Sequence, residues 1–311
     1  MVLRGHRHEF QQHMQSGQPA LTTMQYRQLG TTDLHVSAIG LGCVTFGREI
    51  DRDASFRVLD RAVEAGITLL DTAESYGDGA SERVLGEWMT ERDARSRVVL
   101  ITKVAPPLTR EHILTSLEQS LQRLHTDCVD LFLLHSWDND VPLEESFSAL
   151  TSLVEQGKAR YVGCSNFTAS QLRRSLQTQD REGHTRMACI QPIYNLVHRE
   201  IEEAMLPLCQ AESVGVITYS PLGAGFLTGK YTRNGPIPEG TRFAVKPGHQ
   251  RIYFSERGFR IVEDLRRRSA ETGQSMIQLA LGWAFSRPGI TSTLIGARNT
   301  GHIEQALQAF D

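Results

Sequence analysis

The sequence has no long apolar run and no block of like charge. No apolar stretch approaches the roughly 18 residues that a membrane-spanning helix needs, and the start, MVLRGHRHEFQQHMQ, lacks the apolar core of a secretory signal. We therefore expect a cytoplasmic protein without a membrane partner. Lys and Arg total 33 against 36 Asp and Glu, a formal charge of −3, and no charge run tracks a phosphate backbone. A nucleic-acid partner is not expected.

Cysteine is scarce and irregularly spaced. The chain has five cysteines without a CxxC pair: Cys43, Cys128, Cys164, Cys189 and Cys209. Because disulfide frameworks and structural zinc sites show regular, paired spacing, this set predicts reduced and mostly buried thiols. We expect no metal site.

Eight apolar runs of strand length are the main positive signal. They read VSAIGLGCVT, ITLLDTA, VVLITKV, DLFLLHS, ARYVGCSN, CIQPIYN, VGVITYSPL and STLIGA. Nearly continuous apolar runs are typical of parallel strands that are covered on both faces. The first seven runs begin 25 to 32 residues apart, which is the pitch of a repeated strand–helix unit.

Stretches with helical periodicity separate these runs. We predict helices over 53–65, 80–91, 109–124, 143–156, 168–178, 200–212, 255–272, 275–286 and 299–310. The alternation predicts a single-domain (β/α)8 TIM barrel over residues 24–311. An open doubly wound sheet is the alternative, but it favours GxGxxG after an early strand, and GLGCVTFG lacks that spacing.

Two segments depart from the regular pitch. Residues 223–252 are rich in Gly and Pro and too long for an ordinary connection, which predicts a functional loop between the seventh and eighth strands. Residues 1–23 are polar and unpatterned, and we expect a loosely attached overhang. The segments QYRQLG and LHVSAIG predict a short strand pair that closes the bottom of the barrel.

Proton-handling side chains stand at three consecutive strand ends. Asp71 and Tyr76 follow the second run, Lys103 ends the third and His135 ends the fourth. Active sites of such barrels are built at the carboxyl ends of the strands. A neighbouring ammonium lowers the pKa of a phenol, and a carboxylate can hold that ammonium. Taken singly each residue also has an ordinary structural role, so the prediction of catalysis rests on their joint placement.

The sequence resembles the aldo-keto reductases from about Met24 to its end. The motifs DTAESYGDGASERVLGEWM, ITKV, LLHSWD, GKARYVGCSNF, QPIYNL, YSPLGAGFLTGKY and LIGARN match that family in order. The resemblance implies an NADP-dependent oxidoreductase that reversibly reduces an aldehyde or ketone to an alcohol. It makes Tyr76 the general acid, which Lys103 and His135 tune, and pairs Asp71 with Lys103.

The resemblance also implies a set of cofactor-binding residues. The side chains that would hold the nicotinamide are Ser165, Asn166, Gln191 and, stacked on its ring, Tyr219. The residues that would surround the phosphates and adenosine are Ser220, Leu222, Gly225, Leu227, Lys230, Gly296, Arg298 and His302. Arg298 opens the last helix and matches a place that holds the 2′-phosphate, so NADPH is expected in preference to NAD. A Gly-rich surface loop and a solvated arginine are the ordinary alternatives.

The chain departs from the family pattern at its end. His302 stands where Gln is frequent, and Gln305 and Ala306 replace residues that usually contact adenine. We therefore expect affinity to depend on the pyrophosphate and Arg298. Related chains usually continue further, so a segment beyond Asp311 is expected to be missing.

The pocket for the small-molecule carbonyl or alcohol substrate is predicted from Thr45, Phe46, Trp137 and the 223–252 loop. Two other functions remain open at this point. One is a nicotinamide-binding regulatory subunit, because some relatives of this fold are channel partners. The other is a non-redox barrel enzyme, an isomerase or metal-dependent hydrolase that uses the same strand-end acids. The sequence specifies neither the substrate nor the oligomeric state.

Overall fold

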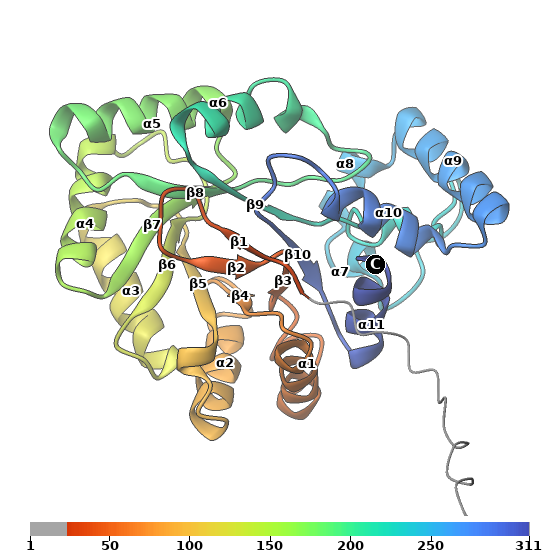
Figure 1. Ribbon diagram of the computed structural model, residues 1–311, viewed down its shortest axis with the longest axis horizontal. Coiled ribbons are helices and arrows are strands. Elements are labelled where there is room, and N and C mark those ends of the chain that lie inside the picture. Colours follow the sequence, from red (N-terminus) through yellow and green to blue (C-terminus); the bar gives the residue numbers. More distant parts are fainter. Residues whose placement is uncertain (1–23, 311) are drawn as a thin grey trace, which may run out of the picture.

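The computed structural model describes residues 24–310, so the predicted overhang 1–23 lies outside the described residues. Eight parallel strands close into a barrel in the order β10-β3-β4-β5-β6-β7-β8-β9 (Figure 1). Their bounds are β3 Ile39–Gly42, β4 Leu69–Asp71, β5 Val99–Val104, β6 Val129–Leu134, β7 Ala159–Ser165, β8 Met187–Gln191, β9 Gly215–Tyr219 and β10 Ser292–Gly296. Each strand overlaps one of the eight predicted runs, although β6 and β8 begin one and two residues before theirs, and the (β/α)8 barrel is confirmed.

Helices surround the strands and bury their apolar faces against them (Figure 1). They are α1 Arg52–Glu64, α2 Ala80–Glu91, α3 Arg110–Leu124, α4 Leu143–Glu155, α5 Ala169–Glu182, α6 Met205–Glu212, α9 Glu256–Thr272, α10 Met276–Phe285 and α11 Thr300–Gln308. Side-chain caps fix where helices begin. The Asp51 carboxylate accepts the Ala54 N–H at 2.8 Å at the start of α1, and the Thr109 hydroxyl caps α3. The helix α9 lies outside α10.

A hairpin closes the bottom of the barrel, as predicted. The strands β1 Tyr26–Gln28 and β2 His35–Ser37 pair antiparallel, and Leu29 of the connecting turn is buried in the barrel interior. Gly30 follows with φ +54°, and a Cβ there would lie 2.7 Å from the Ser213 carbonyl oxygen. Only glycine permits this close approach of the hairpin to the barrel.

Two predicted elements are each divided in the structure. The run that begins at Val36 is not one strand, because the Ser37 hydroxyl donates to the Ile39 carbonyl at 2.6 Å where the hairpin ends and β3 begins. The predicted helix 200–212 is a 3-10 turn, Glu200–Glu202, followed by α6. Pro207 has no N–H and fits only the first turn of a helix, which agrees with the start of α6 at Met205.

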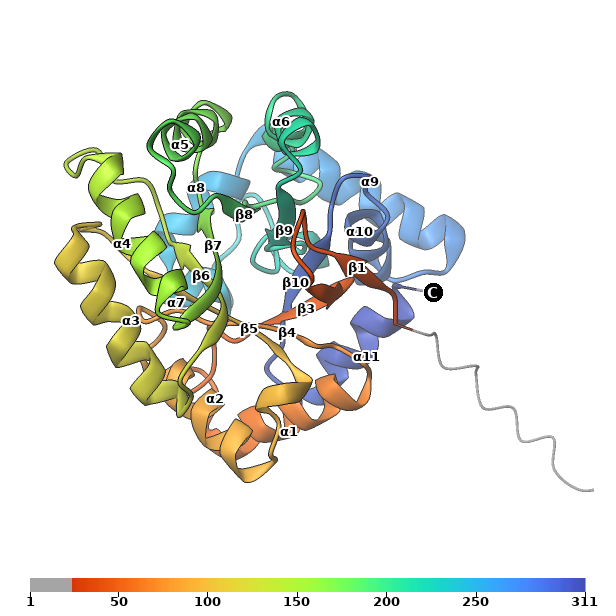
Figure 2. The same ribbon diagram turned by 60° about the vertical axis from the view of Figure 1, so that its left-hand side comes forward.

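The predicted 223–252 loop contains short helices. They are the 3-10 helices η3 Phe226–Thr228 and η4 Pro247–His249 and the single turns α7 Arg242–Val245 and α8 Gln250–Tyr253. An aromatic cluster of the buried Phe226, Tyr231, Phe243, Tyr253 and Phe259 packs the loop against α9 and α10. Figure 2 shows α7 and α8 at the end of the barrel opposite to the hairpin.

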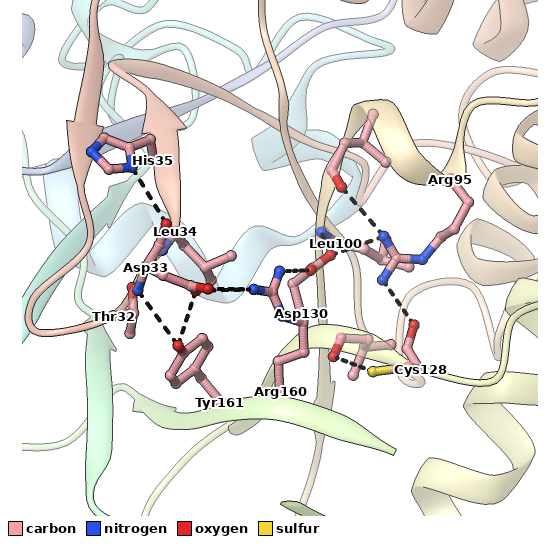
Figure 3. Close-up of polar contacts among 12 residues, drawn as sticks. Thr32, Asp33, Leu34, His35, Arg95, Leu100, Cys128, Asp130, Arg160 and Tyr161 are labelled. Carbon is pink, nitrogen blue, oxygen red and sulfur yellow. Dashed lines mark hydrogen bonds and ion pairs between the residues drawn. The ribbon is translucent and has the colours of Figure 1, made fainter. Parts of the chain in front are cut away.

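An ionic network, which we call the bottom network, ties the hairpin to the barrel (Figure 3). Asp130, only 5% exposed, forms ion pairs at 2.9 Å with Arg95 and Arg160 and accepts the Leu100 N–H at 2.9 Å. Arg160 also reaches the exposed Asp33 of the hairpin turn at 2.9 Å. One buried carboxylate therefore holds two guanidinium groups.

Between residues 24 and 310, no helix is both long and apolar enough to cross a bilayer.

Candidate active site

A cavity of about 540 Å³ lies at the carboxyl ends of the barrel strands. Loops that follow the strands and the 223–252 loop form its wall. Most of the predicted site residues reach it: Thr45, Asp71, Tyr76, His135, Ser165, Asn166, Gln191, Tyr219, Ser220, Leu222, Gly225, Lys230, Gly296, Arg298 and His302. The structure thus brings the predicted catalytic and cofactor-binding groups to one place.

Lys103 is the centre of the predicted catalytic cluster. It is completely buried, and its Nζ lies 2.6 Å from Asp71 Oδ1. It also donates to the Thr72 carbonyl at 2.8 Å and to the Tyr76 hydroxyl at 3.2 Å. These three acceptors satisfy the three donors of an ammonium group, so the side chain has one fixed position.

The protonation state of Tyr76 differs from the sequence-based expectation. Burial raises the pKa of Tyr76 above its usual value, and the opposing charge of Lys103 does not cancel this effect. The predicted lowering was therefore wrong in its net direction, because burial of the phenol outweighs the lysine. Tyr76 remains a neutral phenol at neutral pH and can donate a proton.

Lys103 keeps its charge despite its complete burial. Burial acts to lower the pKa of Lys103, but Asp71 and Tyr76 together outweigh it and the pKa is raised. An ammonium therefore stands permanently beside the Tyr76 hydroxyl.

His135 packs against Tyr76 edge to face, with ring centroids 5.8 Å apart. Burial, with the nearby charge of Lys103, lowers the pKa of His135 to about 4. The imidazole is therefore neutral at physiological pH and can donate one N–H into the cavity. Its backbone is fixed by the Val104 carbonyl, which accepts the His135 N–H at 2.8 Å.

The predicted nicotinamide-binding residues are joined to the catalytic cluster. Gln191 Nε2 donates to Asp71 Oδ1 at 2.7 Å, and the Ser165 hydroxyl donates to the Gln191 carbonyl at 2.7 Å. The Tyr219 hydroxyl donates to Asn166 Oδ1 at 2.7 Å, and Asn166 has a φ of +59°. Amide and hydroxyl groups thus line the cavity next to the carboxylate that holds Lys103.

Lys230 and Arg298 form a cationic part of the wall. Within residues 24–310 neither side chain pairs with a carboxylate, and Arg298 donates to the Gly240 carbonyl at 2.9 Å. Burial and then the charge of Arg298 lower the pKa of Lys230, which places the two cations close together. Two neighbouring cations without a protein counter-ion are suited to phosphate.

Comparison with known proteins identifies the family. The sequence model described as the aldo/keto reductase family matches residues 38–311. The chain belongs to the aldo/keto reductase family. Membership indicates an oxidoreductase that acts on carbonyl compounds, and it favours this class over an isomerase or a hydrolase. The family generally uses a nicotinamide cofactor.

The relatives of this aldo/keto reductase include proteins of two kinds. It is 34% identical over 301 residues to a probable voltage-gated potassium channel subunit beta of Oryza sativa subsp. japonica, covering 93% of this chain and 92% of that protein. A protein of the same description from Arabidopsis thaliana is 32% identical over 306 residues, covering 93% and 92%. The aldo-keto reductase YhdN of Bacillus subtilis (strain 168) is 33% identical over 294 residues, covering 90% and 87%.

Some predicted residues of this aldo/keto reductase do not reach the cavity. Phe46 is completely buried in the core, and Leu227 is buried in the aromatic cluster. Trp137 packs edge to face on Phe167 at 5.1 Å. Lys103 lies behind the wall, where its Nζ donates to the Tyr76 hydroxyl at 3.2 Å.

Several other wall residues were not predicted individually. Thr241, Arg242, Val245, His249 and Ile252 belong to the predicted 223–252 loop, whereas Glu49 and Tyr253 lie outside every predicted pocket segment. Arg242 Nη1 lies 3.5 Å from Glu49 Oε1, which joins the 223–252 loop to the segment after β3. In the sequence, only the length of the loop indicated that it takes part in the site. Its irregular backbone has no periodicity, so the direction of each side chain could not be predicted.

In the described part of this aldo/keto reductase, no three His, Cys, Asp or Glu side chains are grouped so as to hold a metal ion.

Proposed function

We propose that this aldo/keto reductase is an NADPH-dependent enzyme that reversibly reduces an aldehyde or ketone to an alcohol. The observation that carries the proposal is the buried Lys103 ammonium, fixed by Asp71 at 2.6 Å and placed 3.2 Å from the Tyr76 hydroxyl.

The five thiols are free, which supports a reducing cytoplasmic location.

The residues of the cavity fit a nicotinamide dinucleotide. Ser165, Asn166 and Gln191 offer amide and hydroxyl groups for a carboxamide, next to the catalytic cluster. Lys230 and Arg298 offer cations for phosphates. When bound, the cofactor supplies the hydride for the carbonyl carbon.

Tyr76 supplies the proton. In reduction its phenol donates to the developing alkoxide, and burial keeps it protonated at neutral pH by raising its pKa. The Lys103 ammonium then stabilises the phenolate that remains. His135 is neutral and donates an N–H to the carbonyl oxygen, which stabilises the same charge. Alcohol oxidation uses these groups in the opposite direction.

The pH profile of reduction tests these protonation states. We expect kcat/KM to be flat between about pH 6 and pH 8, because His135 has already lost its proton and Tyr76 has kept its own. At higher pH, ionisation of Tyr76 removes the acid and the rate falls. A rising limb centred near pH 6.5 that His135→Gln abolishes would contradict a neutral imidazole.

Coenzyme preference tests Arg298. The variant Arg298→Met removes a cation that no carboxylate pairs with in residues 24–310, and it is expected to weaken NADPH binding by roughly tenfold to a hundredfold. NADH affinity is expected to change by less than about threefold. Dissociation constants from quenching of tryptophan fluorescence measure both. Lys230→Met is the comparison variant and is expected to weaken both coenzymes, since both carry the pyrophosphate.

A second candidate function is an accessory subunit of a channel. The 34% identity to the Oryza sativa protein, over 93% of this chain, favours it. In that case NADPH would bind normally and no aldehyde or ketone would be turned over at a useful rate. Steady-state assays on a broad carbonyl panel separate the two functions.

A further inference from the structure

Exposed apolar side chains gather at the cavity. Within residues 24–310 three large apolar side chains are strongly exposed: Tyr26 at 49%, Val245 at 46% and Ile252 at 39%. Val245 and Ile252 both belong to the cavity wall, whereas Tyr26 lies on the hairpin. Exposed apolar groups that border a concave site are typical of ligand contacts.

The segment that carries these two side chains is firmly anchored. Phe243, two residues before Val245, is completely buried, and Tyr253, directly after Ile252, is 1% exposed. Both rings pack in the aromatic cluster, with their centroids 5.8 Å apart. Val245 and Ile252 are therefore held outward by buried neighbours.

The segment also lies near the catalytic cluster. Arg242, which begins α7, contacts Glu49 at 3.5 Å. Burial lowers the pKa of Arg242, and Tyr76 is among the groups that lie close enough to act on it. The Glu49 carboxylate lies between Arg242, at 3.5 Å, and Arg48, at 2.6 Å, so both guanidinium groups share one protein counter-ion. The apolar wall residues between Thr241 and Ile252 are Val245 and Ile252.

We propose that Val245 and Ile252 bind the apolar chain of the substrate while its carbonyl group faces Tyr76. The substrate class is an aldehyde or ketone with an apolar chain of roughly four or more carbons. This inference rests on the proposed function, and it adds two residues that determine specificity.

The test is the dependence of kcat/KM on chain length from propanal to heptanal. For the unaltered protein we expect a rise of roughly twofold to fourfold for each added methylene. The double variant Val245→Thr with Ile252→Thr keeps β-branched side chains but adds hydroxyls at two exposed positions. It is expected to lower the heptanal-to-propanal ratio by about tenfold and to leave propanal within about twofold.

Tyr26→Thr is the matched control, because it removes an equally exposed apolar side chain at the other end of the barrel. It is expected to keep the chain-length dependence. A flat profile in the unaltered protein, or an unchanged ratio in the double variant, overturns the inference.

Binding of unreactive amides separates this inference from the proposed function. Calorimetry with propanamide and heptanamide, in the presence of NADP⁺, reports chain binding without turnover. If no aldehyde is reduced, the proposed function fails. The apolar chain site still stands in that case if heptanamide binds more tightly than propanamide and the double variant removes this difference in affinity. Equal affinity for both amides overturns the chain site.

Discussion

Replacing Tyr76 with phenylalanine is expected to lower kcat for carbonyl reduction by about a hundredfold to ten-thousandfold, the range for loss of a positioned general acid. The hydroxyl is the only group removed, and its partner at 3.2 Å, Lys103, keeps its bonds to Asp71 and to the Thr72 carbonyl. The variant should therefore fold and bind NADPH. Steady-state kinetics with a broad aldehyde panel measure the loss.

The control for this variant is Tyr161→Phe. It removes a phenolic hydroxyl that donates to Asp33 at 2.9 Å in the bottom network, far from the cavity. We expect it to retain full turnover. If Tyr76→Phe retained turnover as well, Tyr76 would not be the proton donor, whatever the affinity for NADPH.

Replacing Asp130 with alanine is expected to lower the free energy of unfolding by roughly 3 kcal/mol, the lower end of the cost of breaking a buried ion pair, because the two guanidinium groups are partly exposed. Asp130 is 5% exposed and satisfies Arg95, Arg160 and the Leu100 N–H (Figure 3). The variant leaves two guanidinium groups and one amide without their shared partner. Because folded domains are stable by about 5–15 kcal/mol, this is a large share. Urea denaturation measures it.

Asp33→Ala is the matched control in the same network. Its carboxylate is 69% exposed, so its ion pair with Arg160 is screened by solvent and its loss is expected to cost less than about 1 kcal/mol. Similar losses in the two variants would show that burial of Asp130 does not set its contribution. The folded fraction of either variant is expected to keep its activity, because the bottom network lies opposite the cavity.

The barrel and the catalytic cluster were predictable because both depend on regular patterns. Parallel strands at a constant pitch fix which ends meet, so Asp71, Lys103 and His135 had to gather on one rim. The raised pKa of Tyr76 was not predictable, since it depends on how much solvent the surrounding chain removes. That quantity has no local signature in the sequence.

The substrate-facing wall was the least predictable part. Phe46 and Trp137 follow strand ends, yet each packs into protein, because a strand end does not specify the direction of the next side chains. Val245 and Ile252 lie in a segment without periodicity, where buried aromatic neighbours decide which residues face outward. Sequence reasoning located the segment and could not orient it.

The aromatic cluster anchors the 223–252 loop to α9 and α10 in a core distinct from the barrel interior, where the hairpin packs. Distant sites that share no partners contribute additively to stability. Changes at Val245 or Ile252 and changes in the bottom network are thus expected to be energetically independent. Substitutions at these outward-facing positions are thus expected to change the substrate preference without lowering the stability that the bottom network contributes to the barrel.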